Sequence, residues 1–314
     1  MNFYYQSKFS NNIIATIAIG KKHLSDWKKF ALPTWLLYCK KNNISLVCFE
    51  KDLIAKTDLN WKKPTWQKLL IGQMLQKSRY VNVCYLDTDI LINYINAPNI
   101  FQKYENSKIG LVSEIKNLPF DLEQTKRRLA LLRNTFYNKK YPLDSSLFMS
   151  IKNLYKYHGF PNQNNYACAG LFVFNIKNHS QTLSKIFYKY TNKFKTITGG
   201  GDEPVVNYEI LRLKKTYWFD YKFQALWMYE VSRNYPFLFS KNFSTKKLIK
   251  YCIENTLFEN YFLHFAGSWP ESQMWKQKGI LFEKKVNFFK KLDNYYKKNI
   301  KGIPKKKQIK PNKL

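Results

Sequence analysis

Short apolar runs alternate with longer helical patterns over the first 92 residues, and this order constrains the fold more than any other feature. The apolar runs have the length of buried strands, and the segments between them carry apolar residues three or four positions apart. Strand-like runs are 13–20, 44–50 and 80–92, and helix-like segments are 24–41 and 64–78. This alternation predicts an α/β fold, with a central and mostly parallel sheet of the doubly wound, Rossmann-like kind flanked by helices.

Two prolines bear on the helical segments. Pro33 lies inside 24–41, where the missing N–H and the bulk of the ring should kink the helix. Pro64 lies at the start of 64–78, a position where proline is favoured because the first N–H groups of a helix have no partner within it. We therefore expect a kinked first helix, and a second helix with its proline near the start.

The rest of the chain continues the α/β pattern. Strands are expected at 107–114, 166–175 and 260–268, with helices after 175 to about 190 and within 198–214, the latter preceded by a Gly-rich loop. We interpret the mixed polar and aromatic stretch 118–165 as an insertion or cap over a site. The organisation predicted is one domain over 1–270, a helical extension over 271–300 with an amphipathic helix at about 280–298, and a basic, disordered tail over 301–314.

Composition limits the class of protein. The 314 residues, 45% of them hydrophobic, are enough for a folded domain with a substantial core. The formal net charge of +32 points to an acidic partner, which could be nucleic acid, an anionic membrane surface or a phosphorylated small molecule. A compositional bias towards Lys, Asn, Ile, Phe and Tyr with a solvated lysine surface explains the charge equally well.

Cysteine usage and the N-terminus bear on the compartment. The five cysteines are odd in number and form no CxxC pair, which predicts free, buried thiols in a reducing compartment and no zinc site. The N-terminal apolar run is too short to span a bilayer and lacks a small-residue cleavage site, and no later run reaches 18 apolar residues. These features predict a cytoplasmic protein.

Two carboxylates interrupt the apolar run 80–92. In an extended strand Asp87 and Asp89 would project to the same side. Ligands bind at the carboxyl ends of strands in parallel α/β sheets, and two hard oxygen donors suit Mg²⁺ or Mn²⁺. The alternatives are a helix N-cap or a surface pair of aspartates. His264, after the apolar "YFL", is our candidate for a further ligand and would favour Mn²⁺; otherwise it is a core histidine.

Three more charged residues are candidates for the site. Lys68 comes one helix before the aspartates and could reach a phosphate as a point charge, or could be a solvated helix lysine. Asp202 and Glu203 open a helix after "GGG". They either stabilise the positive end of the helix dipole or supply a carboxylate to the reaction centre.

Seven sequence blocks occur in an order that resembles a known family. The blocks are "ATIAIG", "TWQK", "YLDTDILI", "APNIF", "YACAGLFVFN", "DEPVVNY" and "HFAG", and together they cover roughly residues 13–268. In this order they resemble the GT-A nucleotide-sugar glycosyltransferases, and most of all glycosyltransferase family 8 and its glycogenin-like members. The resemblance implies a GT-A domain over 1–270, with 118–165 on the acceptor side.

The resemblance also implies a donor, a cofactor and roles for individual residues. The donor would be a nucleoside diphosphate sugar, usually a UDP-sugar, transferred with retention of configuration to a hydroxyl of a glycan, protein or lipid. Mn²⁺ or Mg²⁺ would be held by Asp87, Asp89 and His264, and Asp202 and Glu203 would lie close to the anomeric carbon. The donor would contact Ala18, Ile19 and Gly20 at the uridine, and Lys68, Asp87, Thr88, Ala169, Gly170 and Gly267 elsewhere.

Two positions depart from the family pattern. Cys168 stands where the family commonly has asparagine, which leaves the identity of the donor sugar open. Pro270 stands where a lysine usually contacts the diphosphate; Lys276 or Lys278 is a candidate to replace that lysine.

Two other functions remain as alternatives. A basic nucleic-acid-binding protein would use the charge and the 18% aromatic content, but no basic motif is concentrated in one place. A nucleotidyltransferase would need a Gly-rich phosphate loop early in the chain, and "AIGKKHL" matches one poorly. The basic C-terminus could also contact an anionic membrane surface.

Overall fold

The computed structural model describes residues 1–137, 147–242 and 244–281. The chain divides into two compact units, Met1–Lys278 and Gly279–Leu314. Only residues 279–281 of the second unit are described, so almost all of the helix expected at 280–298, and the whole tail 301–314, lie outside the described residues. Everything below concerns the first unit.

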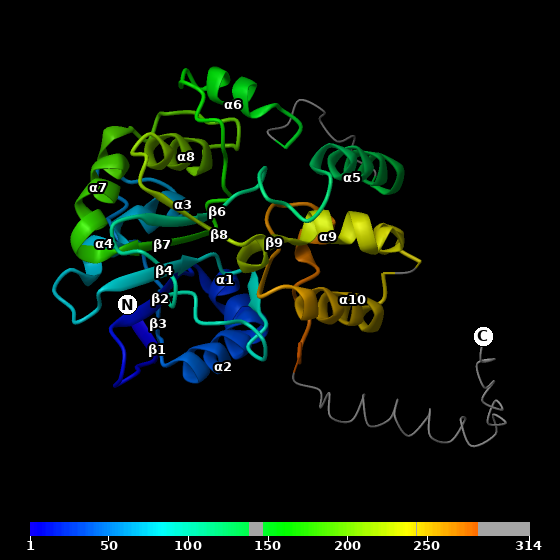
Figure 1. The fold of residues 1–314 in the computed structure, drawn as a ribbon, viewed down its shortest axis with the longest axis horizontal. Coiled ribbons are helices and arrows are strands. Elements are labelled where there is room, and N and C mark those ends of the chain that lie inside the picture. The colour runs from blue at the N-terminus through cyan, green and yellow to red at the C-terminus, as the bar shows by residue number, and fades with distance from the viewer. Residues whose placement is uncertain (138–146, 243, 282–314) are drawn as a thin grey trace, which may run out of the picture. The chain divides into compact units, whose positions relative to one another are not determined.

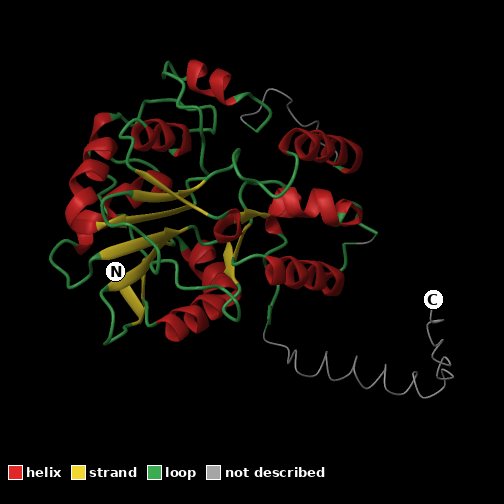
Figure 2. Ribbon diagram, in the orientation of Figure 1, coloured by secondary structure: helices red, strands yellow, loops and turns green. Residues whose placement is uncertain are grey.

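A seven-stranded sheet forms the centre of this unit (Figure 2). Five strands point the same way, while β1 and β7 run against their neighbours. The predicted α/β fold with a mostly parallel sheet is thus confirmed. The strands, in spatial order, are β1 (Asn2–Tyr5), β3 (Ser45–Phe49), β2 (Asn12–Ile17), β4 (Asn82–Leu86), β7 (Leu171–Asn175), β6 (Ile109–Val112) and β8 (Thr216–Phe219).

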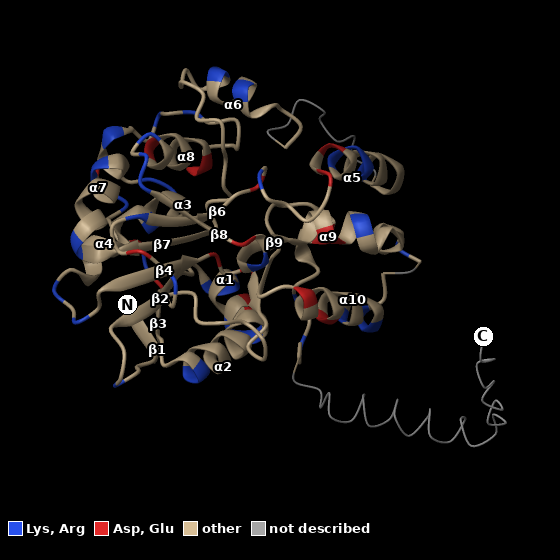
Figure 3. Ribbon diagram, in the orientation of Figure 1, with Lys and Arg blue, Asp and Glu red and all other residues tan. Residues whose placement is uncertain are grey.

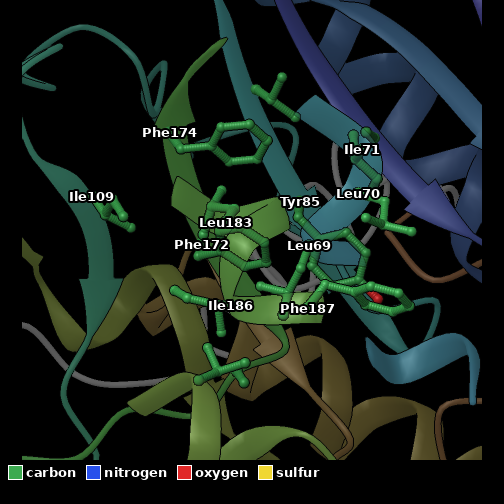
Figure 4. Close-up of a cluster of buried hydrophobic side chains, with 14 of the residues drawn as sticks. Leu69, Leu70, Ile71, Tyr85, Ile109, Phe172, Phe174, Leu183, Ile186 and Phe187 are labelled. Atoms are coloured by element: carbon green, nitrogen blue, oxygen red, sulfur yellow. The ribbon is translucent and has the colours of Figure 1, made fainter. Parts of the chain in front are cut away.

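Helices cover both faces of the sheet (Figure 1). One face packs against α4 (Ile71–Leu75) and α7 (Ile176–Lys189) around a large apolar cluster that includes Phe172, Phe174 and Phe187 (Figure 4). The other face is covered by α2 (Leu32–Asn42), whose Trp35 and Tyr38 are fully buried. Burial on both faces explains why the central strands are apolar throughout instead of alternating.

The prediction of one continuous strand over 80–92 is wrong. The chain leaves the main sheet after β4, turns through Asp87–Asp89, and enters β5 (Ile90–Ile92) of a separate three-stranded sheet. That second sheet has the order β5-β10-β9, with β9 at Ala225–Leu226 and β10 at Phe262–His264. The Ile90 N–H donates to the Asp87 carbonyl across the turn, at 3.3 Å. Aspartate disfavours strands and favours turns, which accounts for the break.

Both predicted N-terminal helices are interrupted. The first consists of α1 (Lys21–Asp26), a π-helical segment (Trp27–Ala31) and α2, and Pro33 lies at the beginning of α2. The expected irregularity therefore falls just before the proline, whose missing N–H interrupts the regular hydrogen-bond ladder. The second consists of α3 (Pro64–Gln67), a 3-10 turn (Lys68–Leu70) and α4, so the segment is helical from Pro64 to Leu75, with a 3-10 turn in its middle that the sequence did not indicate.

Several elements lie beyond the central sheet. The stretch interpreted as an insertion contains α5 (Leu122–Phe136) and α6 (Ile151–Tyr157), and α8 (Glu203–Leu211) follows the Gly-rich loop as expected. Sequence reasoning did not find β1, β8, β9, α9 (Trp227–Asn234) or α10 (Lys246–Glu259).

All five cysteines are free and buried, as predicted. Across the described ranges, no helix combines the length and apolar character needed to cross a bilayer.

Candidate active site

The turn after β4 and the start of β7 lie next to each other because the two strands are antiparallel. Leu86, the last residue of β4, pairs with Leu171, the first of β7, so that the residues before Leu171 reach the carboxyl edge of the sheet. There the Asp87 N–H donates to the Gly170 carbonyl at 2.8 Å. The reversed direction of β7 thus brings two sequence blocks, 85–92 and 166–175, to one place.

His264 reaches the same place through the second sheet. It is the last residue of β10 and pairs with Ile90 of β5, directly after the aspartate turn. The next residue, Phe265, donates its N–H to the Asp89 carbonyl at 3.1 Å. The imidazole is 2% exposed, so the aspartates meet a ring held in position by a strand.

Asp87, Asp89 and His264 form a cluster with the donor set of a divalent cation. The His264 Nε2 atom lies 3.3 Å from Asp89 Oδ1 and 3.8 Å from Asp87 Oδ2, and one ligand atom from each residue lies within 4.8 Å of the others. Both carboxylates remain partly exposed, so a cation and its further ligands can approach. Two carboxylate oxygens and one imidazole nitrogen fit Mn²⁺ well, and Mg²⁺ less well.

Electrostatics within the cluster favour charged side chains. Burial alone would lower the pKa of His264, but Asp89 and Asp87 outweigh that effect and raise it. Conversely, the partial desolvation of Asp89 would raise the pKa of this carboxyl group, but His264 outweighs that effect and lowers it. A cation that binds here would take the place of the imidazole proton as the partner of both carboxylates.

Gly170 has no side chain, and the space that a Cβ atom would take is occupied by atoms of this cluster. A Cβ atom on this residue would lie 2.3 Å from His264 Cε1 and 2.8 Å from Asp87 Oδ2. Both distances are far inside van der Waals contact, and backbone pairing fixes the main chain at His264 and Asp87, so only displacement of these side chains could make room for a Cβ atom. Glycine is therefore required by close approach and not by an unusual φ angle.

Lys68 and Asp202 form a buried ion pair beside the cluster. The Lys68 Nζ atom lies 2.9 Å from Asp202 Oδ2 and donates to the Ala169 carbonyl at 2.7 Å. Burial alone would lower the pKa of Lys68, but Asp202 and then Asp87 raise it, so the ammonium stays charged. Asp202 is the N-cap residue of α8, yet its side chain makes no capping hydrogen bond and faces Lys68 instead.

A cavity of about 200 Å³ connects these groups. Most of the predicted site residues line it, together with Cys168 and four residues that sequence reasoning did not find: Thr65, Thr198, Gly201 and Ala266. Ala18, Ile19, Gly20 and Thr88 are not among its lining residues. Predicted residues that do line it are Lys68, Asp87, Asp89, Ala169, Gly170, Asp202, Glu203, His264 and Gly267.

A second cavity, of about 340 Å³, adjoins the first. It shares Cys168, Thr198, Glu203, Ala266 and Gly267 with the first cavity, and its own lining includes Glu114, Lys126, Tyr166, Tyr229 and Trp269. Residues of α5 and α6, from the stretch interpreted as a cap, contribute to its wall. Glu203 therefore lies between two connected spaces.

Glu203 and Glu114 form a carboxyl pair at this junction. One oxygen of each, and the sulfur of Cys168, lie within 4.8 Å of one another. Burial, and then the charge of Glu114, raise the pKa of Glu203 to about 8, and burial raises the pKa of Glu114 to about 7. Glu114 is the last residue of the strand predicted at 107–114, whose carboxyl end lies at the same edge of the sheet, a signal that could have identified it from sequence.

Comparison with known proteins gives matches at the level of structure only. No protein-family model and no curated protein matches the chain. Similar solved structures are glycosyltransferases. One is involved in glycosylation of the major capsid of PBCV-1 (11% identity, TM-score 0.46, 84% of this chain and 97% of that chain). Another is the galactosyltransferase LgtC in complex with donor and acceptor sugar analogs (12% identity, TM-score 0.44, 83% of this chain and 93% of that chain). A third is the apo form of the bifunctional glycosyltransferase WbbM (12% identity, TM-score 0.42, 85% of this chain and 47% of that chain). Since these TM-scores are below 0.5, the functional assignment rests on the geometry described above.

The Gly170→Ala variant tests the close approach. We expect the added methyl group to push His264 away from Asp87 and to weaken Mn²⁺ binding at least tenfold, an order of magnitude typical of displaced metal ligands. The measurement is a Mn²⁺ titration followed by electron paramagnetic resonance, with circular dichroism to confirm folding. A folded variant with the wild-type affinity would show that the approach is not needed.

Proposed function

We propose that this protein is a metal-dependent glycosyltransferase, which transfers a sugar from a nucleoside diphosphate sugar, most simply a UDP-hexose, to an acceptor hydroxyl. The observation that carries the proposal is the convergence of Asp87, Asp89 and His264 beside the buried Lys68–Asp202 pair, at the carboxyl edge of the sheet. Four carboxyl groups line the first cavity although the chain as a whole has a net charge of +32. Such a concentration of acids calls for a cation.

The proposed metal ligands are Asp87, Asp89 and His264, with Mn²⁺ preferred over Mg²⁺ because of the imidazole. When bound, the cation would stabilise the negative charge that develops on the departing diphosphate. Tyr85 donates its hydroxyl to Asp87 Oδ1 at 2.6 Å, which orients this carboxylate. The donor set fits the ion, and the partial exposure of both carboxylates leaves access for phosphate oxygens.

The remaining donor contacts follow from the family resemblance. Ala18, Ile19 and Gly20 follow β2, which lies beside β4, and we assign them to the uridine, with Thr88 beside the nucleotide. Ala169, Gly170 and Gly267 would approach the donor with their backbone atoms. Lys68 would place its positive charge next to the diphosphate while Asp202 holds its ammonium group in position.

The family lysine that Pro270 replaces has no evident substitute. Lys276, one of the two candidates, forms an ion pair with Asp26 of α1 at 2.9 Å. Its ammonium also lies over the ring of Trp275. Lys276 therefore ties the segment after Pro270 to the first helix, and in this arrangement its charge is already matched by a carboxylate. Lys68 is also paired with a carboxylate, but it lines the donor cavity and Lys276 does not, so we assign the positive charge near the diphosphate to Lys68.

The second cavity is the proposed acceptor site. It opens onto the donor cavity at Glu203, where an acceptor hydroxyl could meet the anomeric carbon. With a pKa of about 8, the Glu203 carboxyl group is mostly protonated at pH 7 and can donate a hydrogen bond. This favours transfer with retention, in which the departing phosphate takes the acceptor proton and no side chain needs to act as a base.

The other expectations find less support. Lys and Arg residues are spread over helices in several parts of the first unit (Figure 3), which does not favour a dedicated nucleic-acid surface. The proposed membrane contact involves the C-terminal residues that are not described. Five free thiols fit a reducing compartment such as the cytoplasm, which we propose as the location.

Removing Asp89 should abolish transfer. We expect Asp89→Ala to lose Mn²⁺-dependent hydrolysis of UDP-sugars, and transfer, by a factor of at least about 10³, because charge stabilisation of this kind dominates such reactions. The assay is a screen of nucleotide sugars with Mn²⁺, read as release of nucleoside diphosphate. Asp121→Ala, which removes an exposed helix-capping carboxylate, is the matched control and should keep full activity. Full activity of folded Asp89→Ala would contradict the proposed site.

Replacing Glu203 separates the two possible roles of its carboxyl group. If the protonated form acts as a hydrogen-bond donor, Glu203→Gln should retain most of the wild-type rate at pH 7. Wild-type activity should fall as the pH rises through about 8, and that of the variant should not. If Glu203 were a general base, the substitution would cost roughly 10²–10⁴ in rate. Pre-steady-state rates from pH 6 to 9.5 decide between the two.

A further inference from the structure

Gln224 is buried directly behind the imidazole of His264. It ends the 3-10 turn Tyr221–Gln224 and leads into β9, which pairs with β10 so that Leu226 lies opposite His264. Its side-chain Nε2 atom lies 3.1 Å from His264 Nδ1, the ring nitrogen that faces away from the aspartates. Gln224 is only 1% exposed, and its Oε1 atom has no hydrogen-bond partner among the described residues.

A cation bound to Nε2 of His264 would determine whether Nδ1 carries a proton. A neutral imidazole carries one proton, and a cation on Nε2 leaves only Nδ1 to carry it. Nδ1–H then needs a hydrogen-bond acceptor, since an unpaired buried donor costs about 1–3 kcal/mol. Only two described side chains have polar atoms recorded near Nδ1, the Gln224 amide and the thiol of Cys168 at 3.4 Å, and a thiol sulfur is a weak acceptor.

We propose that Gln224 is a positioning residue for the metal site, whose amide oxygen accepts the Nδ1–H of His264 and so holds Nε2 as a metal ligand. The inference rests on the metal site of the proposed function, and it assigns a role to a residue outside the three ligands. Second partners of this kind fix both the tautomer and the orientation of metal-binding histidines.

The amide can serve both forms of the ring by a half-turn about its last side-chain bond. In the neutral, metal-free ring, Nε2 carries the proton and faces Asp89 Oδ1, and Nδ1 accepts from the Gln224 NH₂ group. A cation that binds the neutral ring displaces the Nε2 proton while Nδ1 takes one up. From the imidazolium, which Asp89 and Asp87 favour, the cation displaces the Nε2 proton and Nδ1 keeps its own, so in both cases the bound ring carries its proton on Nδ1. The half-turn of the amide then brings Oε1 next to Nδ1–H, and Oε1 loses no other hydrogen bond by this rotation. The amide therefore makes one hydrogen bond to the ring in either form.

The backbone around Gln224 is held in place, so the amide cannot drift from the ring. The Tyr221 hydroxyl accepts from the Leu226 N–H and donates to Glu230 Oε1, both at 3.1 Å. The Lys222 carbonyl accepts from the Tyr261 N–H at 2.8 Å, which ties the turn to the start of the β10 segment. The amide therefore has freedom to rotate but little freedom to move away.

The test is a Mn²⁺ titration of the full-length protein by electron paramagnetic resonance, without any substrate. We expect Gln224→Met to weaken Mn²⁺ binding about 10–100-fold, the range found when such partners are removed. Gln224→Glu keeps an oxygen acceptor in place and should bind Mn²⁺ at least as tightly as the wild type. Gln67→Met, the matched control, removes another fully buried glutamine that hydrogen-bonds elsewhere and should leave the affinity unchanged.

The outcomes separate this inference from the proposed function. If Gln224→Met binds Mn²⁺ as the wild type does while His264→Ala does not, the role of Gln224 is overturned and the metal site stands. If His264→Ala also binds normally, the metal site itself fails. A loss in Cys168→Ala without a loss in Gln224→Met would make the thiol the acceptor and overturn the inference. If Gln224→Met does not fold, a folded Gln224→Glu that binds as weakly as His264→Ala would also overturn it.

A second readout does not depend on affinity. Nitrogen-15 NMR of labelled histidine distinguishes the two tautomers of the ring. On addition of Cd²⁺, a diamagnetic probe, the wild-type His264 should show a proton on Nδ1 with its N–H protected from solvent exchange. In Gln224→Met this protection should be lost. Equal protection in both proteins would contradict the proposed hydrogen bond.

Discussion

Repulsion between Asp87 and Asp89 is the constraint around which this part of the molecule is arranged. The two carboxylates project from one turn at the carboxyl end of β4, and a buried imidazole approaches both. Without a positive partner, charges this close would disfavour the folded state. The positive partner comes from far along the sequence, because His264 is the last residue of β10. Gly170, directly before β7, leaves room for the imidazole, and Gln224 lies behind the ring.

The charged groups of the two cavities differ in how they are balanced. Lys68 and Asp202 form a buried ion pair next to the proposed metal site, in which each partner opposes the effect of burial on the pKa of the other. Among the described residues neither Glu114 nor Glu203 forms an ion pair of this kind, and their raised pKa values favour the protonated carboxyl groups even though Lys126 acts in the opposite direction on Glu114. The proposed cation site and the ion pair line the donor cavity, and Glu203 lies where the two cavities meet. This arrangement suits a reaction in which negative charge moves away from a sugar and an acceptor hydroxyl approaches from the other side.

Sequence alone identified five of the seven strands of the central sheet, because their signals are local, and most residues that line the first cavity came from the ends of apolar runs or from the family resemblance. Apolar runs predict strands, and Asp87, Asp89 and His264 stand at the ends of such runs. The reason given for the convergence of the aspartates was wrong, since they lie in a turn and not in one extended strand. A turn between two sheets depends on pairing with β7 and β10, residues about 80 and 170 positions away, and no local pattern encodes such register. Gln224 was missed for the same reason, because it acquires its role only from a long-range neighbour. Glu114, by contrast, ends a predicted strand and could have been identified from that local signal.

Crystals of the wild-type protein soaked with MnCl₂ and UDP test the central claim most directly, because manganese can be located by its anomalous scattering. The account predicts one strong peak within bonding distance of carboxylate oxygens of Asp87 and Asp89 and of the Nε2 atom of His264, with diphosphate oxygens completing its coordination. An ordered UDP with no manganese between these three side chains, or manganese bound by other residues, would contradict it.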